Sequence, residues 1–163
     1  MDSYRLEVAK MANNQAELTD YLDQLRRLSS SDFAALASFI DPLSPKRWNY
    51  AWGNTNERYL QMMIKPGQGL GGTALRTCRW VKLDDTTSNA AKARGECPLM
   101  LAERLQAAAA FPIKEEGSLE ILGLLYIGKR NHSRYEDNET KPIQENIGKL
   151  LRYMQEDIKK IAK

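Results

Sequence analysis

A glycine-rich stretch over residues 67–72 has the residue types that can hold a ligand through the backbone. Glycine lets the chain adopt positive φ and approach a ligand closely. The helix-compatible run Thr73–Thr77 follows. If a helix starts at Gly71 or Gly72, its first N–H groups have no intrahelical acceptor and, with the helix dipole, attract an anion. The stretch predicts a small-anion site; a tight connection without a ligand is the alternative.

Two common nucleotide-binding motifs are not matched by this stretch. A P-loop requires Gly-Lys-Ser/Thr, which is absent, and no βαβ unit surrounds the partial G-x-G-x-x-G pattern. Trp48 is a second candidate, because its indole offers one N–H donor in the ring plane. The ring face is electron-rich, so its edge should meet an anion. A core aromatic role is equally compatible with Trp48.

No catalytic residue and no metal site are predicted. Cys78 and Cys97 form no C-x-x-C pair, and we expect them to be small buried hydrophobes. The single histidine, His132, lies in a polar stretch, where a solvated loop residue is expected rather than a base or a metal ligand. The acid pair Asp84-Asp85 is expected in a solvated turn. The chain is therefore not predicted to be an enzyme.

Charge and hydropathy indicate a cytoplasmic protein that binds neither nucleic acid nor membrane. The formal net charge is +3, with 24 Lys and Arg interspersed among 21 Asp and Glu. The densest basic run, Lys129-Arg130 with Arg134, is followed at once by acidic residues, so we expect a solvated loop. The longest nearly apolar run, Leu119–Gly128, is far too short to span a bilayer. The N-terminus has no apolar signal-peptide core.

Two terminal helices and an antiparallel sheet are expected to position the glycine stretch. Apolar residues recur at helical spacing near both ends: Leu18, Tyr21, Leu22, Leu25 and Leu28 in a helix of about residues 15–30, and Ile143, Ile147, Leu150, Leu151, Met154, Ile158 and Ile161 in one of about residues 138–162. The expected strands are Phe33–Ile40, Arg47–Trp52, Trp80–Leu83, Leu105–Ile113 and Leu119–Ile127. Hairpin connections favour an antiparallel sheet, hence an α+β fold with both helices on one face.

Several motifs occur together in one order along the chain. They are Arg47-Trp48, the string Gly53–Tyr59, the glycine stretch, Pro112-Ile113, Leu122–Gly128 and Tyr135-x-Asp137. This combination resembles a GAF domain over about residues 17–160. The resemblance implies a single GAF domain over residues 1–163, with a central antiparallel sheet and a ligand pocket on the face opposite the terminal helices.

Within the GAF family, the chain is most similar to stand-alone nitrate receptors, through Arg47-Trp48, Gly53–Tyr59 and Cys97-Pro98-Leu99. That resemblance implies that nitrate binds the backbone amides of Leu70, Gly71 and Leu99, with help from Trp48. A tyrosine of those receptors is Cys97 here, and an alanine is Gly71. The implied function is a cytoplasmic nitrate or small-anion sensor that modulates a sensor histidine kinase of a two-component system, without a cofactor.

Two other functions remain as alternatives. One is a GAF sensory domain of a larger signalling protein that binds another small ligand, and the other is a thiol-dependent methionine sulfoxide reductase. The sheet is expected to cover about three turns of the C-terminal helix. The remainder, Met154–Ile161, is expected to pack on another helix: the N-terminal helix through Leu18, Leu22 and Leu25, a second copy of the chain, or the kinase. We expect homodimerisation or kinase contact through the two terminal helices. The alternative is that these stripes simply cover the sheet.

Overall fold

Five antiparallel strands form the centre of the protein. The computed structural model describes the backbone of residues 16–161 and the side chains of residues 16–155. The strands are β1 Phe33–Ser38, β2 Tyr50–Trp52, β3 Val81–Leu83, β4 Ala107–Ile113 and β5 Gly123–Lys129. Their order is β2-β1-β5-β4-β3, and every neighbouring pair is antiparallel. Both predicted hairpins are present, and the expected antiparallel α+β architecture is confirmed.

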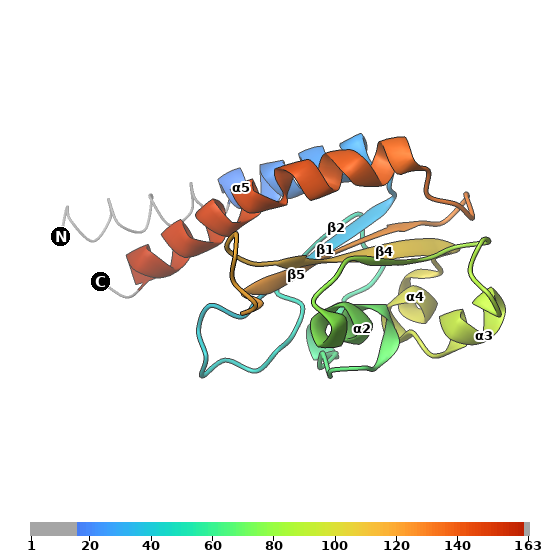
Figure 1. Cartoon of the computed structure of the whole chain (residues 1–163), viewed down its shortest axis with the longest axis horizontal. Coiled ribbons are helices and arrows are strands. Elements are labelled where there is room, and N and C mark those ends of the chain that lie inside the picture. Colours follow the sequence, from blue (N-terminus) through green and yellow to red (C-terminus); the bar gives the residue numbers. More distant parts are fainter. Residues whose placement is uncertain (1–15, 162–163) are drawn as a thin grey trace.

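The two terminal helices cover one face of the sheet, as Figure 1 shows for the helix over residues 16–28 and for α5, Asp137–Ile161. The Tyr21 ring packs 5.3 Å from that of Tyr153, and its hydroxyl donates to the carbonyl of Asn146 at 3.0 Å. Leu18, Leu22 and Leu25 are buried, whereas Leu28 is half exposed and leaves the predicted stripe. The terminal helices therefore form one packed layer.

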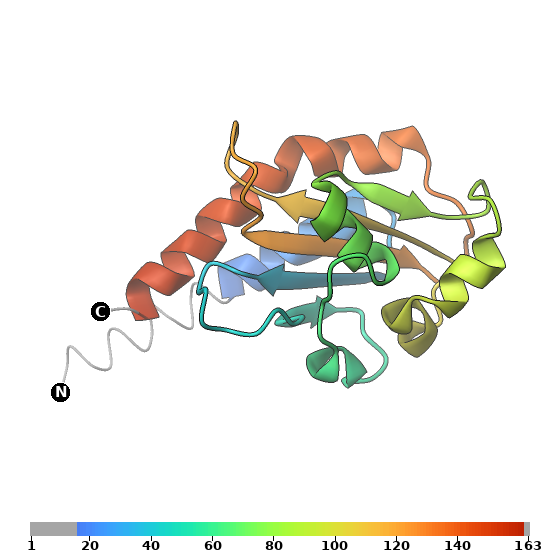
Figure 2. The same ribbon diagram turned by 60° about the horizontal axis from the view of Figure 1, so that its bottom comes forward.

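The opposite face carries the short helices. These are η1 Arg58–Gln61, α2 Gly69–Thr77, α3 Ala90–Gly95 and α4 Pro98–Glu103. Figure 2 shows α2, α3 and α4 on the side of the sheet away from α5. A second apolar cluster, which includes Phe33, Leu99 and Tyr126, fills the space beneath them. The sheet thus separates two cores, one under the terminal helices and one under the glycine-rich segment.

The apolar face of α5 packs on the sheet over a longer part of the helix than the expected three turns. Met154, assigned to the uncovered end, is 2% exposed. Its Cε lies 2.6 Å from the position that a Cβ would take on Gly123, so the expectation that the sheet leaves Met154 uncovered is wrong. Met154 also shares a buried cluster with Leu18 and Leu22 of the N-terminal helix, which is one of the partners expected for it. The side chains of Ile158 and Ile161 lie outside the described residues.

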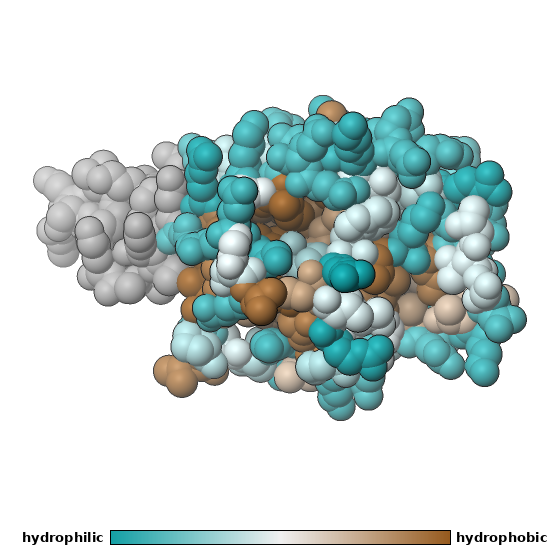
Figure 3. Space-filling model, viewed as in Figure 1, coloured by the Kyte–Doolittle hydropathy of each residue, from teal (hydrophilic) through white to brown (hydrophobic). Residues whose placement is uncertain are grey.

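Hydrophilic residues cover the outward side of α5 in Figure 3. Within residues 16–161, no helix has the length and apolar character needed to cross a bilayer.

Candidate functional site

A small cavity lies where α2 and α4 begin, above the sheet. Its volume is about 50 Å³. Since a cavity needs roughly 10–15 Å³ to hold one water, there is room for a few waters or for one small polyatomic ion. All five residues predicted for ligand binding line it: Trp48, Leu70, Gly71, Cys97 and Leu99. The rest of the described lining is Met62, Met63, Ile64, Gln68, Gly69, Gly72, Pro98 and Tyr126. None of these described residues has a formally charged side chain.

Helix α2 begins earlier than the sequence indicated, at Gly69 rather than at Gly71, Gly72 or Thr73. The preceding turn folds back onto the helix, because the N–H of Gly67 donates to the carbonyl of Gly72 at 2.8 Å. A Cβ on Gly72 would overlap the carbonyl oxygen of Lys65, so the close return of the chain requires glycine there. Residues 69–72 of the glycine stretch therefore form the first turn of α2, and Gly67 and Gln68 belong to the turn before it.

Two backbone donors at the cavity have no acceptor within the described part of the chain. One is the N–H of Gly71 in the first turn of α2, and the other is the N–H of Leu99 in the first turn of α4. Buried N–H groups are normally paired with protein or water, because leaving them unpaired is unfavourable. These two groups are therefore available to a ligand in the cavity.

The string at residues 53–59 holds α4 in place. The Glu103 carboxylate, 1% exposed, accepts from the N–H of Thr55 at 2.6 Å and from the Arg130 guanidinium at 3.3 Å. The Asn56 amide donates to the carbonyl of Ala102 at 2.8 Å. These contacts fix the C-terminal half of α4, and hence the position of Leu99 at its start. The string therefore positions the site without lining it.

Trp48 presents the edge of its indole to the start of α2. It is 5% exposed and lies outside β2, which is shorter than the predicted strand Arg47–Trp52. The Cζ2 atom lies 3.2 Å from the position that a Cβ would take on Gly71. The benzo ring of the indole, through Cζ2 and Cη2, therefore lies against the start of α2, and Trp48 forms part of the cavity wall. A side chain at Gly71 would push this ring away.

Cys97 contributes a neutral thiol to the cavity wall. Burial raises the pKa of Cys97, while the N–H of Leu70 acts on the sulfur in the opposite direction. The other cysteine, Cys78, ends α2 with a positive φ of 58° and is half-buried, and its thiol faces the carbonyl of Leu119. The prediction that both thiols are buried therefore holds for Cys97 and is wrong for Cys78.

Tyr126 is a cavity residue that the sequence analysis missed. Its side chain is 2% exposed and lines the cavity from β5. Among the residues that the structure describes, its hydroxyl is the one buried side-chain oxygen or nitrogen without a hydrogen-bond partner. Its ring meets that of Trp48 edge to face, 5.5 Å between centroids. A tyrosine inside an apolar strand is a signal in itself, because a buried tyrosine hydroxyl normally has a partner.

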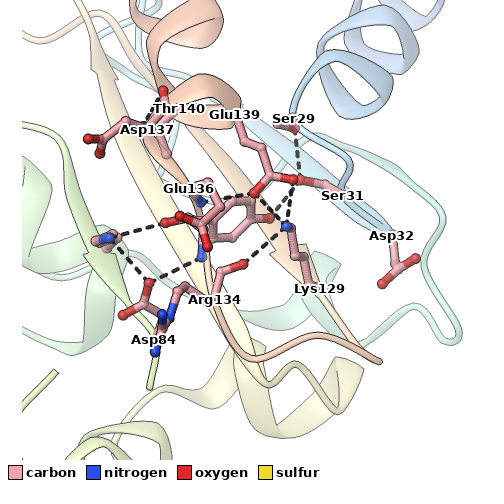
Figure 4. Close-up of polar contacts among 12 residues, drawn as sticks. Ser29, Ser31, Asp32, Asp84, Lys129, Arg134, Glu136, Asp137, Glu139 and Thr140 are labelled. Atoms are coloured by element: carbon pink, nitrogen blue, oxygen red, sulfur yellow. Dashed lines mark hydrogen bonds and ion pairs between the residues drawn. The ribbon is translucent and has the colours of Figure 1, made fainter. Parts of the chain in front are cut away.

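A cluster of buried polar side chains lies where β5 ends, at Lys129. We call it the Tyr135 cluster, and its residues are Ser29, Ser31, Asp84, Lys129, Tyr135 and Glu139. Figure 4 shows Lys129, Glu139 and Ser31 pointing toward one another. The Lys129 ammonium is 2.7 Å from both carboxylate oxygens of Glu139 and 4.7 Å from the Tyr135 ring centroid. The Tyr135 hydroxyl is 2.6 Å from the Ser31 oxygen.

The Tyr135 cluster corrects two expectations. Lys129 is 4% exposed, so the solvated basic loop predicted there is wrong for Lys129. Asp84 is fully buried rather than solvated; it accepts from the N–H of Tyr135 at 3.1 Å and pairs with Lys82 at 3.2 Å. Burial alone would raise the pKa of Asp84, but hydrogen bonds from Thr86, Tyr135 and Lys82 lower it. His132 is exposed, as expected.

Comparison with known proteins identifies the fold. No protein-family model matches the chain, and no curated protein matches it. A solved structure of NreA from Staphylococcus aureus, mutated in its nitrate-binding site, is 29% identical, with a TM-score of 0.62 over 77% of this chain and 95% of that one. The GAF domain of a two-component sensor histidine kinase from Bacillus halodurans is 13% identical, with a TM-score of 0.66 over 91% of this chain and 97% of that one. The chain folds as a GAF domain.

The GAF fold also occurs in an enzyme. A type II free methionine-R-sulfoxide reductase from Thermoplasma acidophilum is 12% identical to this GAF domain, with a TM-score of 0.65 over 90% of this chain and 95% of that one. A shared fold does not by itself establish a shared function. The function of this chain must therefore be argued from its cavity.

Proposed function

We propose that this GAF domain is a sensor that binds a small monoanion, nitrate being the first candidate, in the cavity at the start of α2. The observation that carries the proposal is that two residues lining a cavity of about 50 Å³, Gly71 and Leu99, have N–H groups without an acceptor among the described residues, while no lining side chain is charged. Trp48 lines the same cavity. The similarity to NreA, whose mutated structure concerns a nitrate-binding site, supports nitrate.

The neutrality of the described lining favours a weakly hydrated monoanion. Desolvating an anion is costly unless hydrogen bonds replace its water shell, and the cost rises steeply with charge. Backbone N–H groups and the α2 dipole can replace that shell for a single delocalised charge. A phosphate dianion would need Lys or Arg contacts that this lining lacks. A cyclic nucleotide greatly exceeds the cavity.

The reductase alternative is disfavoured by the state of the two thiols. A nucleophilic cysteine works as a thiolate, which requires a lowered pKa. Burial does the reverse at Cys97, and its thiol faces the N–H of Leu70 rather than a cationic side chain. Cys78 contacts Leu119, outside the residues that line the cavity. The cavity therefore fits reversible binding better than thiol chemistry.

Calorimetric titration tests the proposed ligand class. The purified protein is titrated with nitrate, nitrite, chloride, cyclic GMP and methionine sulfoxide, with a chelator present throughout. We expect saturable binding of at least one small anion, nitrate most tightly, and no binding of the nucleotide. Binding of none of the small anions would contradict the proposal, as would loss of anion binding when the chelator is added.

We also propose that the output is contact through the terminal helices, either between two copies of the chain or with a sensor histidine kinase. A ligand can shift such packing only if it binds two arrangements with different affinity. Replacing Ile158 and Ile161 with Asp should abolish self-association in sedimentation, or the effect on autophosphorylation of a co-expressed kinase, without changing anion affinity. A variant that still self-associates and still regulates the kinase would exclude this surface.

A further inference from the structure

The hydroxyl of Tyr126 is buried without a partner next to the proposed ligand. Tyr126 lies on the central strand β5, directly opposite Ala35 of β1 and Ala110 of β4. All three belong to the core on the cavity side of the sheet. The two alanines are small neighbours of the large tyrosine ring, Tyr126 is one of the residues that line the cavity, and its hydroxyl is near enough to the lining residue Cys97 to interact with it electrostatically. Small neighbours on both strands thus place one hydroxyl group beneath the start of α2.

An unpaired buried hydroxyl is unfavourable in the ligand-free protein. Leaving such a group unsatisfied costs about 1–3 kcal/mol, whereas phenylalanine would fill the same space without that cost. The cost is recovered when the cavity contains an acceptor. Burial raises the pKa of Tyr126 well above its ordinary value, and the neighbouring Cys97 acts in the same direction. The hydroxyl therefore stays protonated at neutral pH and has a proton to donate.

We infer that Tyr126 is a ligand-binding and specificity residue, donating from the floor of the cavity while Gly71 and Leu99 donate from its rim. This inference rests on the proposed anion site and adds a selection rule to it. An oxyanion such as nitrate has several acceptor atoms and can meet donors on two walls at once. Chloride has a single acceptor centre, so it can meet both walls only where the two sets of donors lie within hydrogen-bond reach of one point. Tyr126 therefore favours nitrate over chloride.

Phenylalanine replacement tests the inference with two readouts of opposite sign. Tyr126→Phe should weaken nitrate binding about ten- to hundredfold, as expected for one hydrogen bond to an anion, and weaken chloride binding less. In the same variant without ligand, the thermal unfolding midpoint should rise by about 2 °C or more, because an unpaired buried hydroxyl is removed. A residue with a purely structural role would not combine these effects.

Tyr135→Phe is the matched control, since Tyr135 is equally buried and its hydroxyl is paired with Ser31 at 2.6 Å. It should lower the unfolding midpoint by a few degrees and leave anion affinity unchanged.

The outcomes separate this inference from the proposed function. Nitrate binding equal in Tyr126→Phe and wild type would overturn the role of Tyr126 while the anion site stands. So would nitrate and chloride affinities weakened by the same factor, or a lowered midpoint in the ligand-free variant. If the wild type binds none of the small anions in calorimetry, the proposed function and the inference fall together.

Discussion

Tyr126 and Tyr135 are buried to the same extent, 2% and 1% exposed, but their hydroxyl groups have opposite surroundings. The Tyr135 hydroxyl is 2.6 Å from the Ser31 oxygen, which is 2.8 Å from that of Ser29, and Ser29 donates in turn to the carbonyl of Leu25. The Tyr126 hydroxyl has no partner among the described residues. The Tyr135 hydroxyl is therefore part of a hydrogen-bonded chain, and the Tyr126 hydroxyl has a hydrogen bond left to make.

This difference separates a structural cluster from the proposed binding site. In the Tyr135 cluster, residues from the turn after the N-terminal helix, from β5 and from α5 satisfy one another, so the cluster holds these elements together (Figure 4). At the cavity, three lining residues, Gly71, Leu99 and Tyr126, have donors without a partner among the described residues, and no lining side chain is charged. Substitutions in the cluster should therefore change stability, and substitutions at the cavity should change affinity.

The largest effect is expected from removing Glu139. Lys129 is 4% exposed and has Glu139 as its charged partner, so Glu139→Ala leaves a nearly buried ammonium without a countercharge. The free energy of unfolding should fall by about 3 kcal/mol in urea titrations, with nitrate affinity unchanged. Glu145→Ala, on the exposed side of α5, is the control and should have little effect. Equal stability of the two variants would show that the ion pair is not structural.

A smaller effect, confined to binding, is expected at Gly71. A Cβ there would lie 3.2 Å from Cζ2 of Trp48, so Gly71→Val must displace the indole and fill the cavity. Nitrate affinity should fall about tenfold or more in calorimetry, while circular dichroism shows a folded protein. Gly71→Ala should fall between wild type and Gly71→Val. Unchanged affinity in both variants would refute the cavity as the binding site.

Acid should destabilise the protein through the Tyr135 cluster, because Glu139 becomes protonated there. Burial alone would raise the pKa of Glu139, but hydrogen bonds from the N–H of Glu136 and from Lys129 lower it. A lowered pKa means that the stabilisation is present above the unfolded carboxyl value of about 4.3 and is lost as pH falls through the folded value. The free energy of unfolding of the wild type should therefore decrease as the pH falls below about 4.3. In Glu139→Gln the decrease should be less steep. Equal acid sensitivity of the two proteins would contradict this assignment.

The smallest effect is expected from the thiols. Cys78→Ser combined with Cys97→Ser should keep nitrate affinity within about twofold, because neither thiol is assigned a bond to the ligand. The single variants serve as controls. A strong loss caused by Cys97→Ser alone would show instead that its side chain completes the cavity.

The sequence predicted the site better through motifs than through charge patterns. Family motifs marked Trp48 and Cys97, far apart in the chain, and the structure brings both to one cavity. Tyr126 was missed because strand alternation places it on one face of β5 without revealing which face meets α2. Lys129 and Asp84 were misread as solvated because their partners, Glu139 and Tyr135, come close only through the turn between β5 and α5. Contacts between residues that are distant in the sequence cannot be predicted from the residues next to each partner.

The most direct test of an anion site built from backbone donors is an amide NMR titration with nitrate. The N–H signals of Gly71 and Leu99 should show the largest shifts and saturate with one dissociation constant. The amides of Lys129 and Tyr135, in the Tyr135 cluster, should stay in place. Largest shifts in that cluster, or no saturable shift at Gly71 and Leu99, would contradict the account.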